Sequence, residues 1–249
     1  MTVSLITTCF NRANTIERTI QSVLSQDHNN VEYIVIDGAS TDGSAEIIER
    51  YSDRITHFVS EPDNGMYEAI NKGIRLASGD IIGLIHSDDE FYSQTILSKI
   101  DAAFEQSGAD IVYGNGIFVD MNNPRKIIRN WISGKYKRTK VKQGWLPLHP
   151  TVYAKREVFE QCRLYDESYK IAADSDMLVR MLYNHHFKVY YLNEYIVRMS
   201  MGGISTSFKS QIYKWKEDLR MYRSHNFNPY WTLGGKILSK IPQFLKINV

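Results

Sequence analysis

The first third of the chain alternates short apolar runs with amphipathic segments, and this pattern constrains the fold more than any other feature. Apolar runs typical of strands cover residues 3–8, 33–36, 55–59, 81–85 and 111–113. Segments with helical periodicity separate them, at residues 14–24, 42–51, 66–77 and 94–106. Repeated strand–helix–strand units predict an α/β fold with a mostly parallel central sheet and helices on both of its faces.

Polar residues follow several of these predicted strands at the point where each strand ends. Residues 9–11 follow the first strand, Asp37 follows the second, and Ser87, Asp88 and Asp89 follow the strand at 81–85. In parallel α/β sheets, ligands bind beyond the carboxyl ends of the strands. The sequence therefore places a binding site at this edge of the sheet.

Several phosphate-binding and hydrolytic motifs are missing from the sequence. It contains no GxGxxG after the first strand, no GxxxxGK[ST], no GxSxG and no HExxH. A phosphate group at the acidic strand ends must then be held in another way, and a divalent cation on carboxylates is the obvious one. Adjacent residues of an extended chain point in opposite directions, so one of Asp88 and Asp89 can bind metal while the other binds a ribose hydroxyl. A simple turn or helix cap is the alternative.

Charge is distributed unevenly along the chain, although the net charge is only +2. Acidic residues outnumber basic ones up to residue 110, whereas residues 121–156 contain ten Lys or Arg and no Asp or Glu. The chain is basic again after residue 207. Basic stretches are typical of contacts with nucleic acid, anionic membrane or phosphorylated substrates. We expect an acidic half that binds metal and nucleotide, a basic half that meets an anionic acceptor, and no nucleic acid.

The sequence also carries signals about location. Cys9 and Cys162 form no CxxC pair, which favours a reducing cytosol over a disulfide framework. The N-terminus lacks the features of a signal peptide, and no run approaches the roughly 20 apolar residues of a membrane-spanning helix. Residues 228–249 interleave aromatic and aliphatic side chains with lysines, which predicts a segment on anionic lipid. An amphipathic tail packed on the protein is the alternative.

Four motifs resemble those of the family 2 glycosyltransferases of the GT-A fold, in the same order and over most of the chain. They are SLITTCFNR at 4–12, VIDGASTDGS at 35–44, SEPDNGMYEAINKGIRLASGDIIGLIHSDDEFY at 60–92, and DESYKIAADSDMLVRM at 166–181 with MGGIS at 201–205. The chain is most similar to the branch that builds bacterial surface polysaccharides, including colanic-acid, O-antigen and exopolysaccharide enzymes.

The resemblance implies roles for residues on the donor side. Asp37 matches the residue that receives the nucleobase and marks a uridine donor, and the loop from Thr8 to Asn11 lines the same pocket. In the acidic signature, Asp89 would bind Mn²⁺ or Mg²⁺ and Asp88 the ribose, whereas Ser87 departs from the signature's first Asp. Many members carry Arg where this chain has Ile70, and Lys72 or Arg75 is expected to serve instead.

The resemblance also implies roles on the acceptor side. Asp174 matches the Asp of the family's Glu-Asp motif, which supplies the catalytic base, and Ala173 replaces the Glu. A positioned carboxylate is needed there because an acceptor hydroxyl has too high a pKa to attack unaided. Asp176 is the second candidate, with a helix N-terminal carboxylate as the alternative for one of the two. His149 is expected near the acceptor, or else in a structural role.

Together these features predict an inverting, metal-dependent enzyme that transfers a sugar from a UDP-sugar to an undecaprenyl-pyrophosphate-type acceptor on the inner face of the cell membrane. Residues 1–207 would form the catalytic domain, with a nucleotide-sugar half at 1–110 and an acceptor half at 111–207. Residues 208–249 would form a basic helical extension. Two alternatives are a sugar nucleotidyltransferase, against which the glycine-free loop at 7–15 counts, and a non-catalytic sugar-binding partner.

Overall fold

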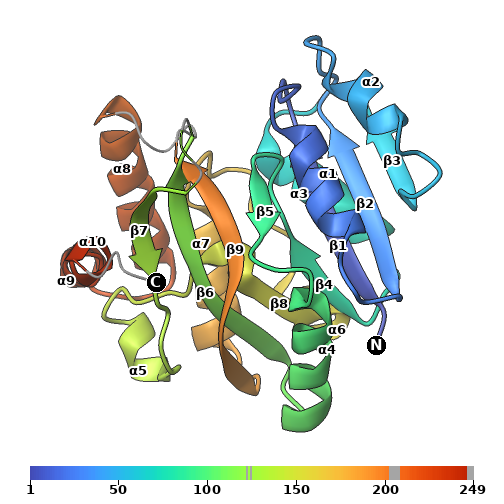
Figure 1. Cartoon of the computed structure of the whole chain (residues 1–249). Helices are drawn as coiled ribbons and strands as arrows, with labels where there is room; N and C mark the ends of the chain where they lie inside the picture. The colour runs from blue at the N-terminus through green and yellow to red at the C-terminus, as the bar shows by residue number, and fades with distance from the viewer. Residues whose placement is uncertain (122, 124, 202–207, 246–249) are drawn as a thin grey trace.

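The computed structural model describes residues 1–121, 123, 125–201 and 208–245, and the described strands form one sheet (Figure 1). The strand order is β3-β2-β1-β4-β8-β6-β9-β5, and β7 pairs with β6 outside this path. The strands are β1 (Val3–Cys9), β2 (Val31–Asp37), β3 (His57–Ser60), β4 (Ile81–Leu84), β5 (Asp89–Phe91), β6 (Ile111–Asp120), β7 (Ile127–Trp131), β8 (Val152–Lys155) and β9 (Val189–Met201).

The described helices connect and flank these strands (Figure 1). They are α1 (Ile16–Leu24), α2 (Ser44–Glu49), α3 (Met66–Leu76), α4 (Ile96–Ser107), α5 (Arg138–Val141), α6 (Arg156–Cys162), α7 (Ala173–Val179), α8 (Phe208–Ser224), α9 (Pro229–Leu238) and α10 (Pro242–Leu245). A 3-10 turn covers His149–Thr151, and a π-helical segment at Arg180–Asn184 continues α7.

The parallel part of the sheet confirms the strand–helix–strand prediction. β1 pairs in parallel with β2 and with β4, and β2 pairs in parallel with β3. The second half of the sheet is mixed, because β8 runs antiparallel to β4 and β6 while β6 and β9 are parallel. Figure 1 shows the resulting sheet with helices on both faces.

Side chains that alternate along the strands feed a separate hydrophobic core on each face. On β1, Leu5 contributes to the core under α1 and α4, whereas Ile6 contributes to the core under α3, α6 and α7. On β2, Val35 contributes to the core under α1 and α4, and Ile34 contributes to the core under α3, α6 and α7. Successive side chains of a strand point to opposite faces of the sheet, so a strand covered on both faces places alternate residues in two cores. The second core also includes Met177 of α7, so α7 is held against the sheet.

Single elements differ from what the sequence pattern alone suggests. Residues 14–17 have the pattern of a capping box, but it does not form, because Thr15 takes the N-cap position and makes no side-chain cap hydrogen bond. The basic segment at 122–150 contains β7 and α5. The strand-like runs at 189–192 and 196–199 belong to one strand, β9. The MGGIS motif lies outside the described residues after Met201.

The C-terminal helices pack on the rest of the protein. Glu217 of α8 accepts hydrogen bonds from the backbone N–H groups of three consecutive residues, 170–172, which lead into α7. Lys236 of α9 donates to Ser175 of α7 at 3.3 Å. Arg129 of β7 donates to Oε1 of Gln243 in α10, through Nε at 2.8 Å. These contacts make α8–α10 one wall of the molecule beside α7 and β7 (Figure 1).

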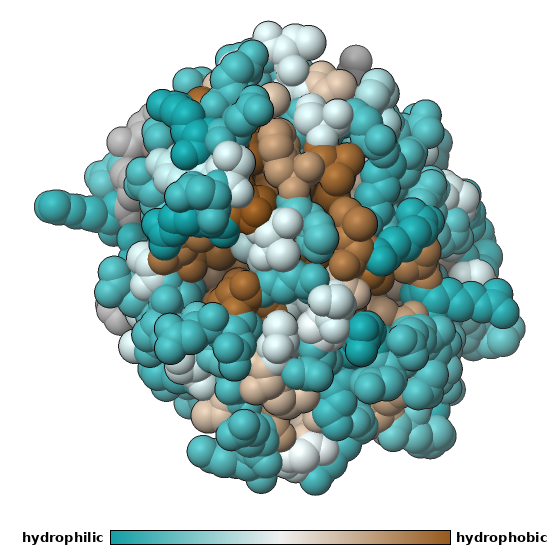
Figure 2. Space-filling view, turned by 90° about the vertical axis from the view of Figure 1, so that its right-hand side faces the viewer, coloured by the Kyte–Doolittle hydropathy of each residue, from teal (hydrophilic) through white to brown (hydrophobic). Residues whose placement is uncertain are grey.

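Figure 2 views the molecule from the right-hand side of Figure 1, where β3 and α2 lie. Hydrophilic side chains dominate this face, and hydrophobic ones show between them near its centre (Figure 2). Among the described residues, no helix is both long and apolar enough to cross a bilayer.

Candidate active site

The carboxyl ends of the parallel strands meet at one edge of the sheet, as the sequence predicts. Cys9 at the end of β1 lies opposite Asp37 at the end of β2. Leu84, the last residue of β4, lies opposite Ile6 of β1, and His86 to Asp89 follow it directly. The predicted nucleoside residues and the acidic pair therefore share an edge.

The Asp37 carboxylate is held in place by neighbouring hydroxyl and amide groups. Ser60 Oγ donates to it at 2.7 Å, and the Ser40 N–H donates at 2.9 Å. The Asp37 side chain is fully buried in this arrangement. Asn11, in the left-handed region at φ 53°, receives the Thr41 N–H on Oδ1 at 2.9 Å and donates its own N–H to Ser40 Oγ at 2.8 Å. Asp37 and Asn11 are thus brought together through Ser40.

The loop after β1 also carries an exposed aromatic ring that the sequence did not single out. Phe10 is 60% exposed and follows directly on buried Cys9. A Cβ at position 38 would lie 2.6 Å from Asp63 Oδ2 and 3.3 Å from the Phe10 ring, so Gly38 lets these two side chains approach the strand end. Burial raises the pKa of Asp63. Thr8, which precedes them, is 8% exposed.

Lys72 has partners other than a phosphate. Its Nζ lies 2.9 Å from a Glu61 carboxylate oxygen and 3.2 Å from a Glu68 carboxylate oxygen, and it donates to the Pro62 carbonyl at 3.1 Å. The hydrogen bond to Glu61 is the main cause of the raised pKa of Lys72. Lys72 is thereby engaged on α3, and its predicted role in donor binding stays a prediction.

The two adjacent aspartates after β4 occupy different environments. Asp88 is partly exposed, and its charge acts on the nearby imidazole of His86. Asp89 is 1% exposed and belongs to β5, where it pairs with Met199 of β9. Burial, followed by the charge of Asp88, raises the pKa of Asp89 well above its ordinary value. Its Oδ2 finds no hydrogen-bond partner among the described residues.

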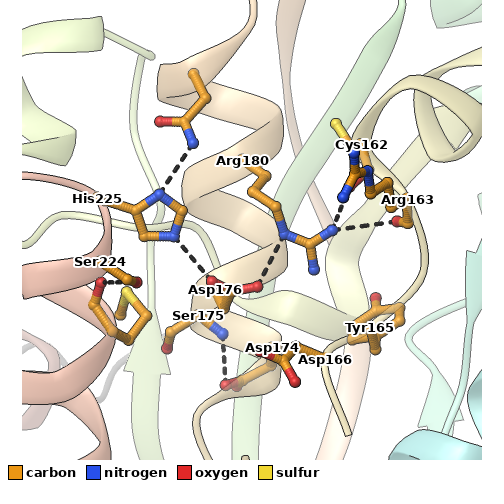
Figure 3. A network of polar contacts seen from close by, with 12 residues as sticks. Cys162, Arg163, Tyr165, Asp166, Asp174, Ser175, Asp176, Arg180, Ser224 and His225 are labelled. Atoms are coloured by element: carbon orange, nitrogen blue, oxygen red, sulfur yellow. Dashed lines mark hydrogen bonds and ion pairs between the residues drawn. The ribbon is translucent and has the colours of Figure 1, made fainter. Parts of the chain in front are cut away.

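Asp174 lies in the first turn of α7 with its carboxylate partly exposed. Its Oδ1 accepts the Ser175 N–H at 2.6 Å, and Figure 3 shows this contact. Burial alone would raise the pKa of Asp174, but the charges of Lys214, His149 and Lys236 outweigh it and hold the pKa below its ordinary value. The Asp174 carboxylate is therefore ionised at neutral pH.

Two histidines connect the acidic strand end with α7. The His86 and His149 rings stack with centroids 6.2 Å apart, and His149 Nε2 lies 2.8 Å from the Tyr165 hydroxyl. Burial lowers the pKa of His149 to about 4 and also lowers that of His86, although the charge of Asp174 acts in the opposite direction on both. Both rings are thus neutral at pH 7. His149 therefore lies near Asp174, on the side of the site where the sequence predicts the acceptor.

Asp176 is two residues further along α7 and belongs to a separate ion-pair network. Its Oδ1 lies 2.8 Å from His225 Nε2, and its Oδ2 lies 2.8 Å from Arg180 Nε. Figure 3 shows the Asp176 carboxylate between these two partners, with Asp174 pointing elsewhere. Burial would raise the pKa of Asp176, but the hydrogen bond from His225 and the charge of Arg180 outweigh it and lower the pKa. Asp176 therefore ties α7 to the residues after α8.

The residues present fit a cation that takes part of its ligands from the substrate. Among the described residues, no three His, Cys, Asp or Glu side chains form a group that could hold a metal ion by themselves. Mg²⁺ and similar cations are commonly bound by one or two carboxylates together with substrate phosphates. Asp88 offers a partly exposed carboxylate for this purpose, whereas Asp89 is buried.

Comparison with known proteins decides the family. A family model described as "Glycosyl transferase family 2" matches residues 4–162. The chain belongs to glycosyl transferase family 2. An uncharacterized glycosyltransferase of Mycobacterium tuberculosis is 30% identical over 187 residues, which cover 72% of this chain and 68% of that protein. A PGL/p-HBAD biosynthesis glycosyltransferase of Mycobacterium bovis is 25% identical over 210 residues, covering 82% and 79% respectively.

Solved structures of glycosyltransferases share the fold of this family 2 member. TarS of S. aureus in complex with UDP-GlcNAc aligns with a TM-score of 0.70 at 16% identity, covering 89% of this chain and 65% of that chain. The mannosyltransferase PcManGT from Pyrobaculum calidifontis, in complex with GDP-Man and Mn²⁺, aligns with a TM-score of 0.65 at 17% identity, covering 94% and 68%. The family 2 chain thus has the GT-A fold and is a glycosyltransferase.

Two pockets on the family 2 chain are lined mainly by residues other than the predicted site residues, although Arg75 lines the second of them. One of about 610 Å³ lies between α5 and the start of α9, and one of about 670 Å³ lies between α3 and α6. Neither includes Asp37, Asp88 or Asp174. The arrangement of acidic groups at the strand ends, more than the size of a cavity, therefore identifies the candidate active site.

Proposed function

We propose that this protein is an inverting glycosyltransferase that moves a sugar from a UDP-sugar to a lipid-linked saccharide acceptor during bacterial surface polysaccharide synthesis. The observation that carries the proposal is the ionised Asp174 carboxylate, which shares its surroundings with His86 and His149 at the end of β4. A carboxylate that stays ionised at neutral pH can accept the proton of an attacking hydroxyl.

The donor binds across the strand ends in this proposal. Asp37 receives the uracil edge, with Thr8 and Asn11 beside it. The exposed Phe10 ring offers an apolar face on which the base stacks. Support comes from two structures of similar fold, in which TarS is in complex with UDP-GlcNAc or UDP.

Asp88, in place of the Asp89 expected from the sequence, is the carboxylate that we assign to the metal. Asp88 is partly exposed, whereas the Asp89 side chain is 1% exposed and has a raised pKa. A bound Mn²⁺ or Mg²⁺ would supply charge stabilisation to the leaving diphosphate. The presence of Mn²⁺ in the PcManGT structure supports this assignment.

Exposed apolar side chains of the C-terminal helices support a peripheral position on the inner face of the cell membrane. Trp231 is 73% exposed and Leu238 is 66% exposed, and Tyr230, Ile241 and Phe244 are exposed as well. Aromatic and aliphatic side chains next to lysines are typical of helices that lie on a bilayer. A lipid-linked acceptor would be delivered at such a surface.

Turnover with a panel of UDP-sugars tests the proposal. We expect UDP release that requires both a divalent cation and a lipid-pyrophosphate saccharide acceptor. Pyrophosphate release from a nucleoside triphosphate and a sugar phosphate would show a nucleotidyltransferase instead. Binding of sugar without any turnover, in the presence of metal, would show a non-catalytic partner.

The anomeric configuration of the product tests the mechanism. A single in-line displacement on a UDP-α-sugar gives a β linkage, which the anomeric NMR coupling of the product reports. An α product from an α donor would exclude a single displacement and remove the need for Asp174 as the base.

A further inference from the structure

Three cationic side chains from different parts of the chain lie on or next to the C-terminal helices α8–α10. Arg129 comes from β7, Lys214 from α8, and Lys240 follows the end of α9. Arg129 Cζ lies 4.4 Å and Lys240 Nζ 5.9 Å from the centroid of the same ring, that of Trp131. The shared Trp131 ring brings Arg129 and Lys240 together, and the charges of Lys214 and Arg129 both lower the pKa of Lys240.

None of these three cations forms a salt bridge with a carboxylate within the described part of the chain. Arg129 Nε donates to the neutral side chain of Gln243. The neighbouring Lys236 is different, because its Nζ lies 2.7 Å from Asp218 Oδ1.

The pKa of Lys240 reflects the positive charges near it. Burial, followed by the charges of Lys236, Lys214 and Arg129, lowers the pKa of Lys240 to about 7, and only Asp218 acts in the opposite direction. Burial also lowers the pKa of Arg129 to about 10. Like charges held together without a salt-bridge partner favour the binding of an anion, which would restore the charged form of Lys240.

The same cluster lies close to the proposed base. Lys214 is the first of the cations whose charge lowers the pKa of Asp174, and it is also one of the three that lower the pKa of Lys240. Lys214 therefore links the two sites.

We propose that Arg129, Lys214 and Lys240 form an anion subsite that holds the diphosphate of the acceptor lipid and so presents the acceptor hydroxyl to Asp174. The inference rests on the proposed function and deepens it, because it assigns the acceptor's diphosphate to named residues. Lysine and arginine bind phosphate groups through charge-assisted hydrogen bonds. The exposed side chains of Ile241 and Phe244 lie next to the cluster and suit the apolar chain of such a lipid.

Binding of inorganic pyrophosphate in calorimetry is the first test. Lys240→Gln is expected to weaken pyrophosphate about tenfold, because one charge-assisted contact is lost. Lys216→Gln is the matched control, since Lys216 is exposed on α8 two residues after Lys214, and we expect it to bind like wild type. Equal affinities for wild type and Lys240→Gln, or equal losses in both variants, would overturn the proposal.

Proton uptake gives a second readout that a structural role would not produce. A bound anion raises the pKa of Lys240 from about 7, so pyrophosphate binding at pH 8 takes up a proton. The binding enthalpy should therefore depend on the ionisation enthalpy of the buffer. That dependence should disappear in Lys240→Gln, and its persistence in this variant would assign the proton to another group and overturn the proposal.

Binding of three further ligands distinguishes an acceptor diphosphate from the donor nucleotide and from membrane headgroups. Farnesyl diphosphate should bind more weakly to Lys240→Gln than to Lys216→Gln, whereas UDP and phosphatidylglycerol vesicles should bind equally to both. A matching loss of UDP affinity would assign the cluster to the donor. Selective loss of vesicle binding, with farnesyl diphosphate unaffected, would assign it to membrane headgroups. Neither outcome is compatible with an acceptor subsite.

These measurements separate the inference from the proposed function, because none of them requires turnover. UDP-sugar turnover without selective pyrophosphate or farnesyl diphosphate binding would remove the subsite and leave the transferase. Selective binding without UDP-sugar turnover would keep a diphosphate site and remove the assigned reaction.

Discussion

The carboxylates of Asp174 and Asp176 lie two residues apart on α7 and have no hydrogen-bond or ion-pair partner in common among the described residues. Asp174 accepts the Ser175 N–H, and the charge of Lys214 is the largest of those that lower its pKa. Asp176 is paired with His225 and Arg180 (Figure 3). Residues two apart on a helix point to different faces, so the first carboxylate is available to a substrate and the second is not.

Replacing Asp174 with Asn is expected to abolish transfer while UDP binding stays nearly unchanged. Loss of a well-placed general base costs about 10²–10⁴-fold in rate, and Asp174 does not contact the predicted nucleoside residues. Turnover and UDP calorimetry on the same preparation check this. If Asp176→Asn, refolded to the same extent, proved to be the inactive variant, the mechanism would stand and the residue assignment would be wrong.

Replacing Asp176 with Asn is expected to destabilise the fold. Breaking a buried ion pair by removing one partner costs about 3–5 kcal/mol, and the Asp176 side chain is only 7% exposed. Because the folded-state pKa is lowered, this stability is present above the unfolded pKa of about 3.9 and is lost as pH falls through the folded pKa. Urea unfolding should show a gap between wild type and variant that is constant near neutral pH and closes in acid.

Asp88 and Asp89 should respond differently to the same substitution. Asp88→Asn is expected to remove metal-dependent activity, whereas Asp89→Asn keeps the fold and most activity, because the Asp89 side chain is buried and burial raises its pKa. Activity in the presence of chelator, restored with Mn²⁺ or Mg²⁺, provides the measurement. If Asp89→Asn were inactive and Asp88→Asn active, the metal would have to be assigned to Asp89.

Phe10→Ala is expected to weaken UDP binding. Base–aromatic stacking is worth about 1–3 kcal/mol per base, and the Phe10 ring is exposed beside Gly38. Calorimetry with UDP checks this, and Tyr190→Ala is a suitable control because Tyr190 is exposed on β9. Similar UDP affinities for both variants would place the base elsewhere.

Membrane association should depend on the exposed face of α9. A Trp231→Ala, Leu238→Ala double variant is expected to lose most flotation with phosphatidylglycerol liposomes, because both side chains are more than half exposed and do not support the core. The Tyr190→Ala protein should float as wild type does. Unchanged flotation of the double variant would show that the C-terminal helices pack on the protein and that this face does not bind membrane.

The sequence by itself determined the parallel half of the sheet and the edge at which the site lies. Apolar periodicity is a local property, so the strands at 3–8, 33–36 and 81–85 could be placed from neighbouring residues alone. The position of Asp37 and Asp88 at the carboxyl ends of β2 and β4 followed directly. The family motifs added the roles that spacing cannot supply.

Only the tertiary structure decided which of two nearby carboxylates is available. Asp88 and Asp89 are adjacent, yet pairing of β5 with the distant β9 buries Asp89. Likewise, His225 reaches Asp176 because α8 packs across α7, 49 residues away in the chain. Arg129, Lys214 and Lys240 come together for the same reason: partners of a side chain depend on how elements far apart in sequence pack, and no local pattern records that packing.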